Sequence, residues 1–108
     1  MTEAALEALG DGRFALRGPV VFATAGELLA EGNRLFAGSP QVRIEMAAVT
    51  RVDSAALALL IEWLRQAKAS GQSLSFQAMP EKLRAIAKLT GAGDILEPGG
   101  SSGAAGAA

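Results

Sequence analysis

Asp53 and Ser54 are the two residues of this chain whose types and positions could carry chemistry. They stand in the stretch TRVDSAALALLIEWLRQA, residues 50–67, directly before an unbroken apolar run from Ala55 to Ile61. Asp and Ser are preferred at helix starts, because their oxygens accept hydrogen bonds from amides that the first turn leaves unpaired. A second interpretation is that the Ser54 hydroxyl is displayed for a partner or a kinase. A phosphate there would meet the positive end of the helix dipole but also the Asp53 carboxylate.

The residue types that are missing exclude most enzymatic chemistry. The chain has no Cys and no His, so the usual zinc sites and the Ser-His and Cys-His catalytic pairs are not available. Its glycines match neither a dinucleotide-binding fingerprint nor a Walker A loop. Glu45, Asp53 and Glu62 could be imagined as paired carboxylates, but solvated or capping roles are favoured. We therefore expect no catalytic residue, metal site or cofactor.

Charge and hydropathy narrow the choice of partners. The ten basic and eleven acidic residues are interspersed, which gives no basic stripe for a nucleic acid. The apolar run of residues 55–61 is far shorter than the roughly 18 residues that span a bilayer. The amino terminus lacks the basic segment and apolar run of a secretory signal. We expect a soluble cytoplasmic protein without nucleic acid and without direct membrane insertion.

The first elements are predicted from alternation and turn residues. Segments 4–9 and 13–17 flank the turn sequence GDG, which is typical of a β-hairpin. The sequence VVFA, residues 20–23, could add a further short strand. The sequence TAGE fits a capping box, in which the Thr24 hydroxyl accepts from the amide near Glu27 and a helix runs from Thr24 to Ala37.

The remaining elements alternate between strand and helix. A strand is predicted at residues 41–46, a helix at residues 54–70 that closes on Gly71, and a strand at residues 73–79. Pro80 begins a last helix, up to Gly91. The face of this helix is predicted to comprise Leu83, Ile86, Ala87 and Leu89. Ile95 and Leu96 form a short final strand or simply pack down.

This order of elements predicts a single small α/β domain over residues 1–96. Strands joined by helices imply a mixed sheet with a parallel portion, right-handed crossovers and about three covering helices. Residues 97–108 are Gly, Ser and Ala after a short start, which is typical of a flexible tail.

The helix over residues 54–70 has two apolar sides in its first half. On a helical wheel, its sheet-facing side comprises Ala56, Leu57, Leu60, Ile61, Leu64 and Ala67. The opposite side comprises Ala55, Ala58, Leu59, Glu62 and Gln66, with Trp63 and Arg65 at its borders. An exposed apolar patch predicts a partner-binding face. The alternative is a helix that its own domain covers on both sides, and Trp63 is then a half-buried core residue rather than an interface anchor.

The sequence from Val42 to Gly91, and above all its stretch VDSAALALL, resembles the STAS domains. This family includes anti-sigma factor antagonists and the cytoplasmic ends of anion transporters. The resemblance covers about residues 4–96, and within the family the stretch looks most like the MlaB-type subunits of bacterial phospholipid-transport ABC complexes. It implies a STAS-like fold.

The resemblance also implies a function and a site. Ser54 matches the Ser/Thr that antagonists phosphorylate and that MlaB-type proteins place against an ATPase, and Asp53 matches the acid before it. Antagonists usually continue with a second Ser and a Gly, where this chain has Ala55 and Ala56. The implied function is therefore a non-catalytic subunit that binds an MlaF-like ATPase of a membrane complex and maintains outer-membrane lipid asymmetry, peripheral to the inner membrane. The alternative is an anti-sigma factor antagonist that is phosphorylated at Ser54. The predicted partner-binding residues are Asp53, Ser54, Ala55, Ala58, Leu59, Glu62 and Trp63.

Overall fold

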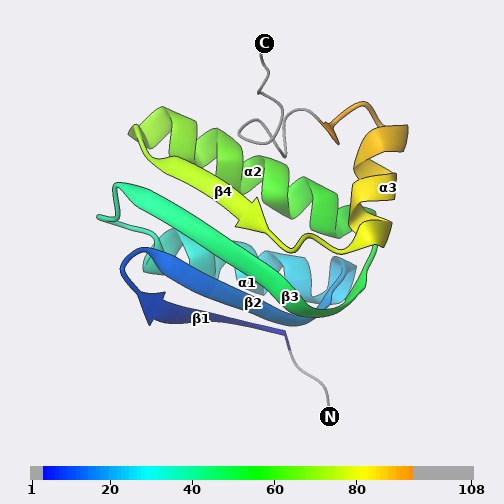
Figure 1. Cartoon of the computed structure of the whole chain (residues 1–108), viewed down its shortest axis with the longest axis horizontal. Helices are drawn as coiled ribbons and strands as arrows, with labels where there is room; N and C mark the ends of the chain where they lie inside the picture. Colours follow the sequence, from blue (N-terminus) through cyan, green and yellow to red (C-terminus); the bar gives the residue numbers. More distant parts are fainter. Residues whose placement is uncertain (1–3, 94–108) are drawn as a thin grey trace.

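The chain opens with a β-hairpin and then alternates helices and strands (Figure 1). The structure is a computed structural model that describes residues 4–93. The elements are β1 (Ala5–Gly10), β2 (Arg13–Val20), α1 (Phe22–Leu35), β3 (Gln41–Val52), α2 (Ser54–Ser70), β4 (Ser73–Gln77) and α3 (Glu81–Leu89). The predicted α/β class and element order are confirmed. The final strand considered at Ile95 and Leu96 lies outside the described residues.

The four strands form one mixed sheet in the order β1-β2-β3-β4. β1 and β2 pair antiparallel, while β2 with β3 and β3 with β4 pair parallel. The hairpin turn requires positive φ at Gly10, Asp11 and Gly12, which Gly adopts freely and Asp tolerates. Val20 pairs with Val52 at the carboxyl ends of β2 and β3. The residues that start α1 and α2 are therefore brought to the same edge of the sheet.

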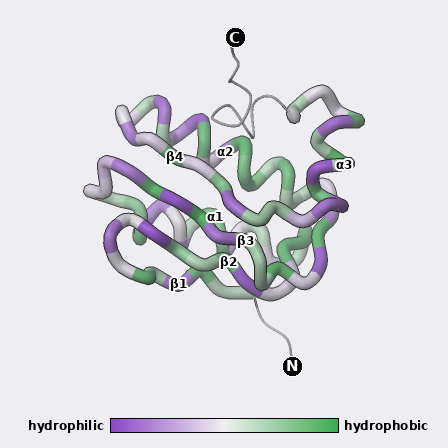
Figure 2. The backbone as a smooth tube through the Cα atoms, in the orientation of Figure 1, coloured by the Kyte–Doolittle hydropathy of each residue, from purple (hydrophilic) through white to green (hydrophobic). Residues whose placement is uncertain are grey.

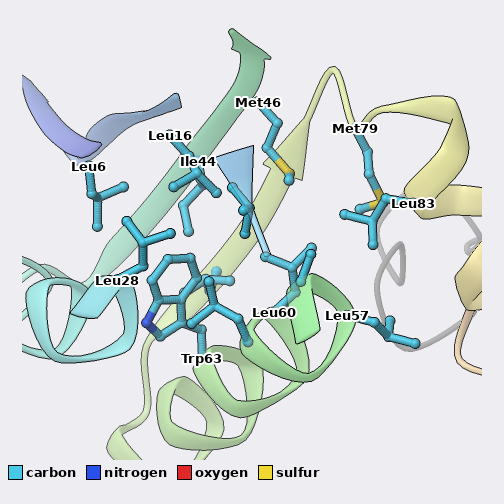
Figure 3. Close-up of a cluster of buried hydrophobic side chains, with 14 of the residues drawn as sticks. Leu6, Leu16, Leu28, Ile44, Met46, Leu57, Leu60, Trp63, Met79 and Leu83 are labelled. Atoms are coloured by element: carbon cyan, nitrogen blue, oxygen red, sulfur yellow. The ribbon is translucent and has the colours of Figure 1, made fainter. Parts of the chain in front are cut away.

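Helices α1 and α2 cover one face of the sheet (Figure 1). Alternate residues of β2 and β3 point to this face and are buried there, for example Leu16 and Ile44, which are fully inaccessible. Figure 3 shows them beside Leu28 of α1 and Leu60 of α2. The opposite face of the sheet carries polar residues, with exposed ion pairs Arg13–Glu45 and Arg17–Glu7.

The start of α1 differs from the prediction. The helix begins at Phe22 rather than Thr24 and ends at Leu35 rather than Ala37. Thr24 is the third residue of the helix, and its hydroxyl accepts from the Val21 amide at 3.0 Å and donates to the Pro19 carbonyl at 2.8 Å. Its hydroxyl therefore serves the residue before the helix and not the amide near Glu27. The separate strand expected at residues 20–23 is also wrong, because Val20 ends β2 and Val21 is the N-cap of α1.

Helix α3 confirms part of its predicted face. Leu83 and Ala87 are buried, and Ile86 is half-buried. Leu89 is 89 % exposed, so its predicted place on this face is wrong. Six residues at about 100° each turn Leu89 roughly 120° away from Leu83, which takes it off the buried stripe.

Candidate partner-binding surface at the start of two helices

The Asp53 carboxylate joins the first turns of both sheet-covering helices. Asp53 is the N-cap of α2, and its Oδ1 accepts from the Ala55 amide at 2.8 Å. Its Oδ2 accepts from the Phe22 amide, in the first turn of α1, at 3.1 Å. Both amides belong to the set that a helix start leaves unpaired. The capping role considered for Asp53 is therefore confirmed, and it extends to a second helix.

The parallel pairing of β2 and β3 makes this double contact possible. Asp53 has extended backbone torsion angles, φ −140° and ψ −168°, which are typical of an N-cap residue. No acidic residue lies in the first turn of α1 or of α2. Asp53 therefore supplies a negative charge at two helix amino termini, where it interacts favourably with both dipoles.

Ser54 is the first residue of α2 and is exposed. Within residues 4–93 its hydroxyl makes no hydrogen bond, because Asp53 accepts from the Ala55 amide instead. Of the two residues considered as caps, Asp53 does the capping. The hydroxyl of Ser54 is left accessible to solvent at the edge where β2 and β3 end.

The outer side of α2 changes character along the helix. Ala55 is half-buried and Ala58 is exposed, and neither brings charge or bulk to this surface. Figure 2 shows this first part of the helix as hydrophobic. Charge begins at Glu62, which accepts from the Arg65 Nε at 3.0 Å and from Gln66 at 2.9 Å.

The hydrogen bonds at Glu62 shift two pKa values. The hydrogen bond from Arg65 is the main cause that lowers the pKa of Glu62, and the bond from Gln66 adds to it. The same pair raises the pKa of Arg65. Because both groups are exposed, this network is screened by solvent and salt. It defines the charged boundary of the apolar start of α2.

Leu59 and Trp63 do not lie on the outer surface where the helical wheel placed them. Their side chains are only 4 % and 1 % exposed, because α1 covers this flank of α2. Figure 3 shows the Trp63 ring between the helices, close to Leu28 and Leu60. The Trp63 ring also meets Phe36 edge-on, with centroids 5.3 Å apart. Their predicted exposure is wrong. Trp63 is a core residue, as the alternative had it, but it is fully buried rather than half-buried.

Gly32 of α1 makes room for the Trp63 ring. A Cβ atom at position 32 would lie 2.5 Å from the indole Nε1 and 2.6 Å from Cε2, which is closer than real Cβ contacts allow. Nε1 is buried, and the described part of the chain offers it no hydrogen-bond partner. This contact therefore depends on shape alone.

Phe22 is a surface residue that sequence reasoning did not identify. Its side chain is 85 % exposed, although its amide is bound to Asp53. The segment had been interpreted as a strand end, and a strand interpretation gives no reason to expect an exposed ring. The parallel pairing of strands that end near residues 20 and 52 is the signal that could have placed Phe22 beside Asp53.

The described residues hold no metal-binding cluster and no membrane-spanning helix. Residues 4–93 contain no group of three His, Cys, Asp or Glu that could hold a metal ion. No helix in this part of the chain is both long and apolar enough to cross a membrane.

Comparison with known families places this surface in context. The family model described as "Mlab, STAS domain" matches residues 5–97. This chain belongs to the MlaB-type STAS domain family. STAS domains are generally non-catalytic domains for regulation and interaction. Among proteins with curated functions, none matches the sequence.

Solved structures share the fold. A sulfate transporter family protein from Wolinella succinogenes superimposes with a TM-score of 0.65 at 18% identity, over 85% of this chain and 75% of that one. The anti-sigma factor antagonist SpoIIAA in its unphosphorylated form gives 0.62 at 14% identity, over 81% and 83%. A structure of Mglu gives 0.56 at 29% identity over 71% of this chain, which spans only 19% of Mglu. The predicted STAS-like fold is confirmed.

Proposed function

We propose that this protein is a non-catalytic subunit that binds and supports the ATPase subunit of a phospholipid-transport ABC complex of the Mla type. The observation that carries the proposal is the surface at Ser54, Ala55 and Ala58, in a chain of the MlaB-type family. In this proposal ATP belongs to the partner. The subunit stays in the cytoplasm, at the inner membrane through that partner, and helps to maintain outer-membrane lipid asymmetry.

The chemistry of the surface supports binding to a protein rather than to a charged ligand. Ser54 offers one uncharged hydroxyl, and the small side chains of Ala55 and Ala58 allow close approach of another backbone. An interface core is typically depleted of charged residues, as this surface is until Glu62. Asp53 contributes by fixing the helix starts, since both of its oxygens already accept amides.

One observation favours a second candidate function. Ser54 is exposed and its hydroxyl is unbonded in the described chain, so a kinase could reach it. A Ser54-phosphorylated anti-sigma factor antagonist is therefore the alternative, and SpoIIAA shares the fold. Incubation with anti-sigma serine kinases and ATP would separate the two functions. Phosphate incorporation at Ser54, with no ATPase binding, would support the alternative.

The main test measures binding of the full chain to the Mla-type ABC ATPase of the same organism. We expect a stable complex by size exclusion, and lower ATP hydrolysis by the transporter without this subunit. Ser54→Asp should remain folded, because position 54 is exposed in the first turn of α2, where the helix dipole favours a carboxylate, yet it should lose most binding. The reason is that a carboxylate without a counterion is costly in an apolar interface.

Two variants control this test. Ser54→Thr keeps the hydroxyl and should bind well. Ser75→Asp adds the same charge on β4, on the sheet face that the helices leave open, and should bind like the unmodified chain. The proposal is wrong if the chain elutes alone while the transporter hydrolyses ATP at full rate. Equal affinities for Ser54→Asp and Ser75→Asp would show that the ATPase does not bind at Ser54.

A further inference from the structure

Phe22 stands out among the aromatic residues of the described chain. It is 85 % exposed, whereas Phe14, Phe36 and Trp63 are 5 % exposed or less and Phe76 is half-buried. A single exposed apolar side chain is ordinary on a protein surface. The role of Phe22 therefore depends on where its side chain lies and on how its backbone is held.

Two hydrogen bonds hold the backbone at Phe22 and at the residue before it. Its amide donates to the Asp53 Oδ2 at 3.1 Å. The preceding Val21 amide donates to the Thr24 hydroxyl at 3.0 Å. The ring is thus free in solvent while its point of attachment is held. A side chain presented in this way loses less conformational freedom on binding than one on a mobile loop.

Beyond Asp53, the residues at the start of α2 that follow the contact with Phe22 are small and uncharged. Asp53 links the Phe22 amide directly to the start of α2, where Ser54, Ala55 and Ala58 follow. On α1, Gly26 lies one turn after Phe22 and is exposed, and a Cβ there would meet no atom within 4 Å. Phe22 is therefore a large apolar projection beside a surface of small residues.

We infer that Phe22 is a specificity-determining residue that inserts its ring into an apolar pocket of the ATPase subunit. This inference rests on the proposed function. The occupant follows from continuity, because Asp53 joins the Phe22 amide to the start of α2, so a partner that contacts Ser54 and Ala55 also reaches Phe22. A buried Phe removes a large apolar area from water, so one ring can account for much of the affinity.

The test uses Phe22 and Leu89 as a matched pair. Both are large apolar side chains, 85 % and 89 % exposed, but Leu89 lies on α3 and not at the Asp53 edge. Affinities of the full chain and of Phe22→Ser and Leu89→Ser for the purified Mla-type ATPase are measured by calorimetry. We expect Phe22→Ser to weaken binding about thirtyfold or more, as at an interface hot spot, and Leu89→Ser to change it less than twofold.

Two further measurements make the result specific. Phe22→Leu, which keeps an apolar side chain, should retain most of the affinity. The loss caused by Phe22→Ser should be the same at low and high salt, because an apolar contact is not screened. Thermal melts of the variants should match that of the unmodified chain, since both side chains are exposed. Phe22→Leu also covers the case in which Phe22→Ser does not fold.

The outcomes separate this inference from the proposed function. If the unmodified chain binds the ATPase and Phe22→Ser binds as well as Leu89→Ser, the inference is wrong and the proposed function stands. If the unmodified chain does not bind the ATPase at all, both are wrong. If Phe22→Leu lost as much affinity as Phe22→Ser, the inference would also be wrong, because an apolar pocket that accepts Phe should accept Leu in part.

Discussion

The start and the middle of α2 hold α1 in opposite ways. At the start, the Asp53 carboxylate accepts amides from both helices, and Ser54 beside it is exposed. In the middle, Trp63 fits against Gly32 with its Nε1 unbonded and its ring 1 % exposed. In the first contact, each carboxylate oxygen accepts a hydrogen bond at the surface. The second contact is apolar and depends on the fit between the ring and the glycine. The contact in the middle is closed to solvent, whereas the start of α2 leaves Ser54 at the surface, where the proposed binding requires it.

This difference explains why the sequence alone placed residues of both regions on one partner-binding face. A wheel of α2 alone places Ala55, Ala58, Leu59 and Glu62 together, because it contains no information about what lies against the helix. α1 covers one flank of that group and buries Leu59. The rest of the group stays at the surface, where its role in binding remains a prediction.

The largest effect should come from the middle contact. Gly32→Ala should lower the free energy of unfolding by about 1–3 kcal/mol, because the new Cβ would overlap the Trp63 ring and force it to move. Gly26→Ala on the same helix has open space and should be neutral or stabilising by up to about 1 kcal/mol. Urea unfolding of both variants measures this.

A double-mutant cycle sharpens the same prediction. In a Trp63→Leu background the ring is gone, so Gly32→Ala should cost clearly less than in the unmodified chain. Trp63→Leu is itself destabilising, since it leaves part of a buried site unfilled. Equal costs of Gly32→Ala in the two backgrounds would show that Gly32 is not required by the Trp63 ring.

The next effect concerns the start of α2. Asp53→Ala removes acceptors from the Ala55 and Phe22 amides and should cost about 1–2 kcal/mol of unfolding free energy. Ser54→Ala should change stability by less than about 0.5 kcal/mol, because its hydroxyl caps nothing. Urea unfolding compares the two. An equal or larger cost for Ser54→Ala would mean that Ser54 shares the capping.

The local pattern of the sequence predicted those parts of the fold that depend on neighbouring residues. The limits of α2, its Gly71 end and the starts of β3 and β4 follow from alternation, capping residues and glycine, which act within a few positions. The ends of these strands differ from the prediction, because β3 continues past residue 46 to Val52 and β4 ends at Gln77 instead of residue 79. The start of α1 did not follow in this way. Thr24 satisfies the pattern of a cap, but its hydroxyl serves Val21 and Pro19, which only the end of β2 brings into reach.

The candidate site was predictable only in part for the same reason. Asp53 as a cap for its own helix is local, and the sequence indicated it. Its second bond, to the Phe22 amide, joins residues 31 positions apart and requires the parallel pairing of β2 and β3. The burial of Trp63 likewise depends on Gly32, a residue of another helix that the pattern of α2 does not contain.

The smallest effect lies at the charged boundary beyond the apolar start of α2. The Arg65 hydrogen bond lowers the pKa of Glu62, so the ionised carboxylate stabilises the folded state. This contribution is fully present above the ordinary glutamate pKa of about 4.3 and is lost as the pH falls through the lowered value. Carboxylate NMR of Glu62 against pH should show a midpoint below the ordinary one.

Arg65→Met should raise this midpoint, whereas Lys68→Met, which removes a charge from the same helix, should leave it nearly unchanged. High salt should weaken the shift because the pair is exposed. If Arg65→Met and Lys68→Met had the same effect, the shift would reflect the general charge of the helix rather than the Glu62–Arg65 pair.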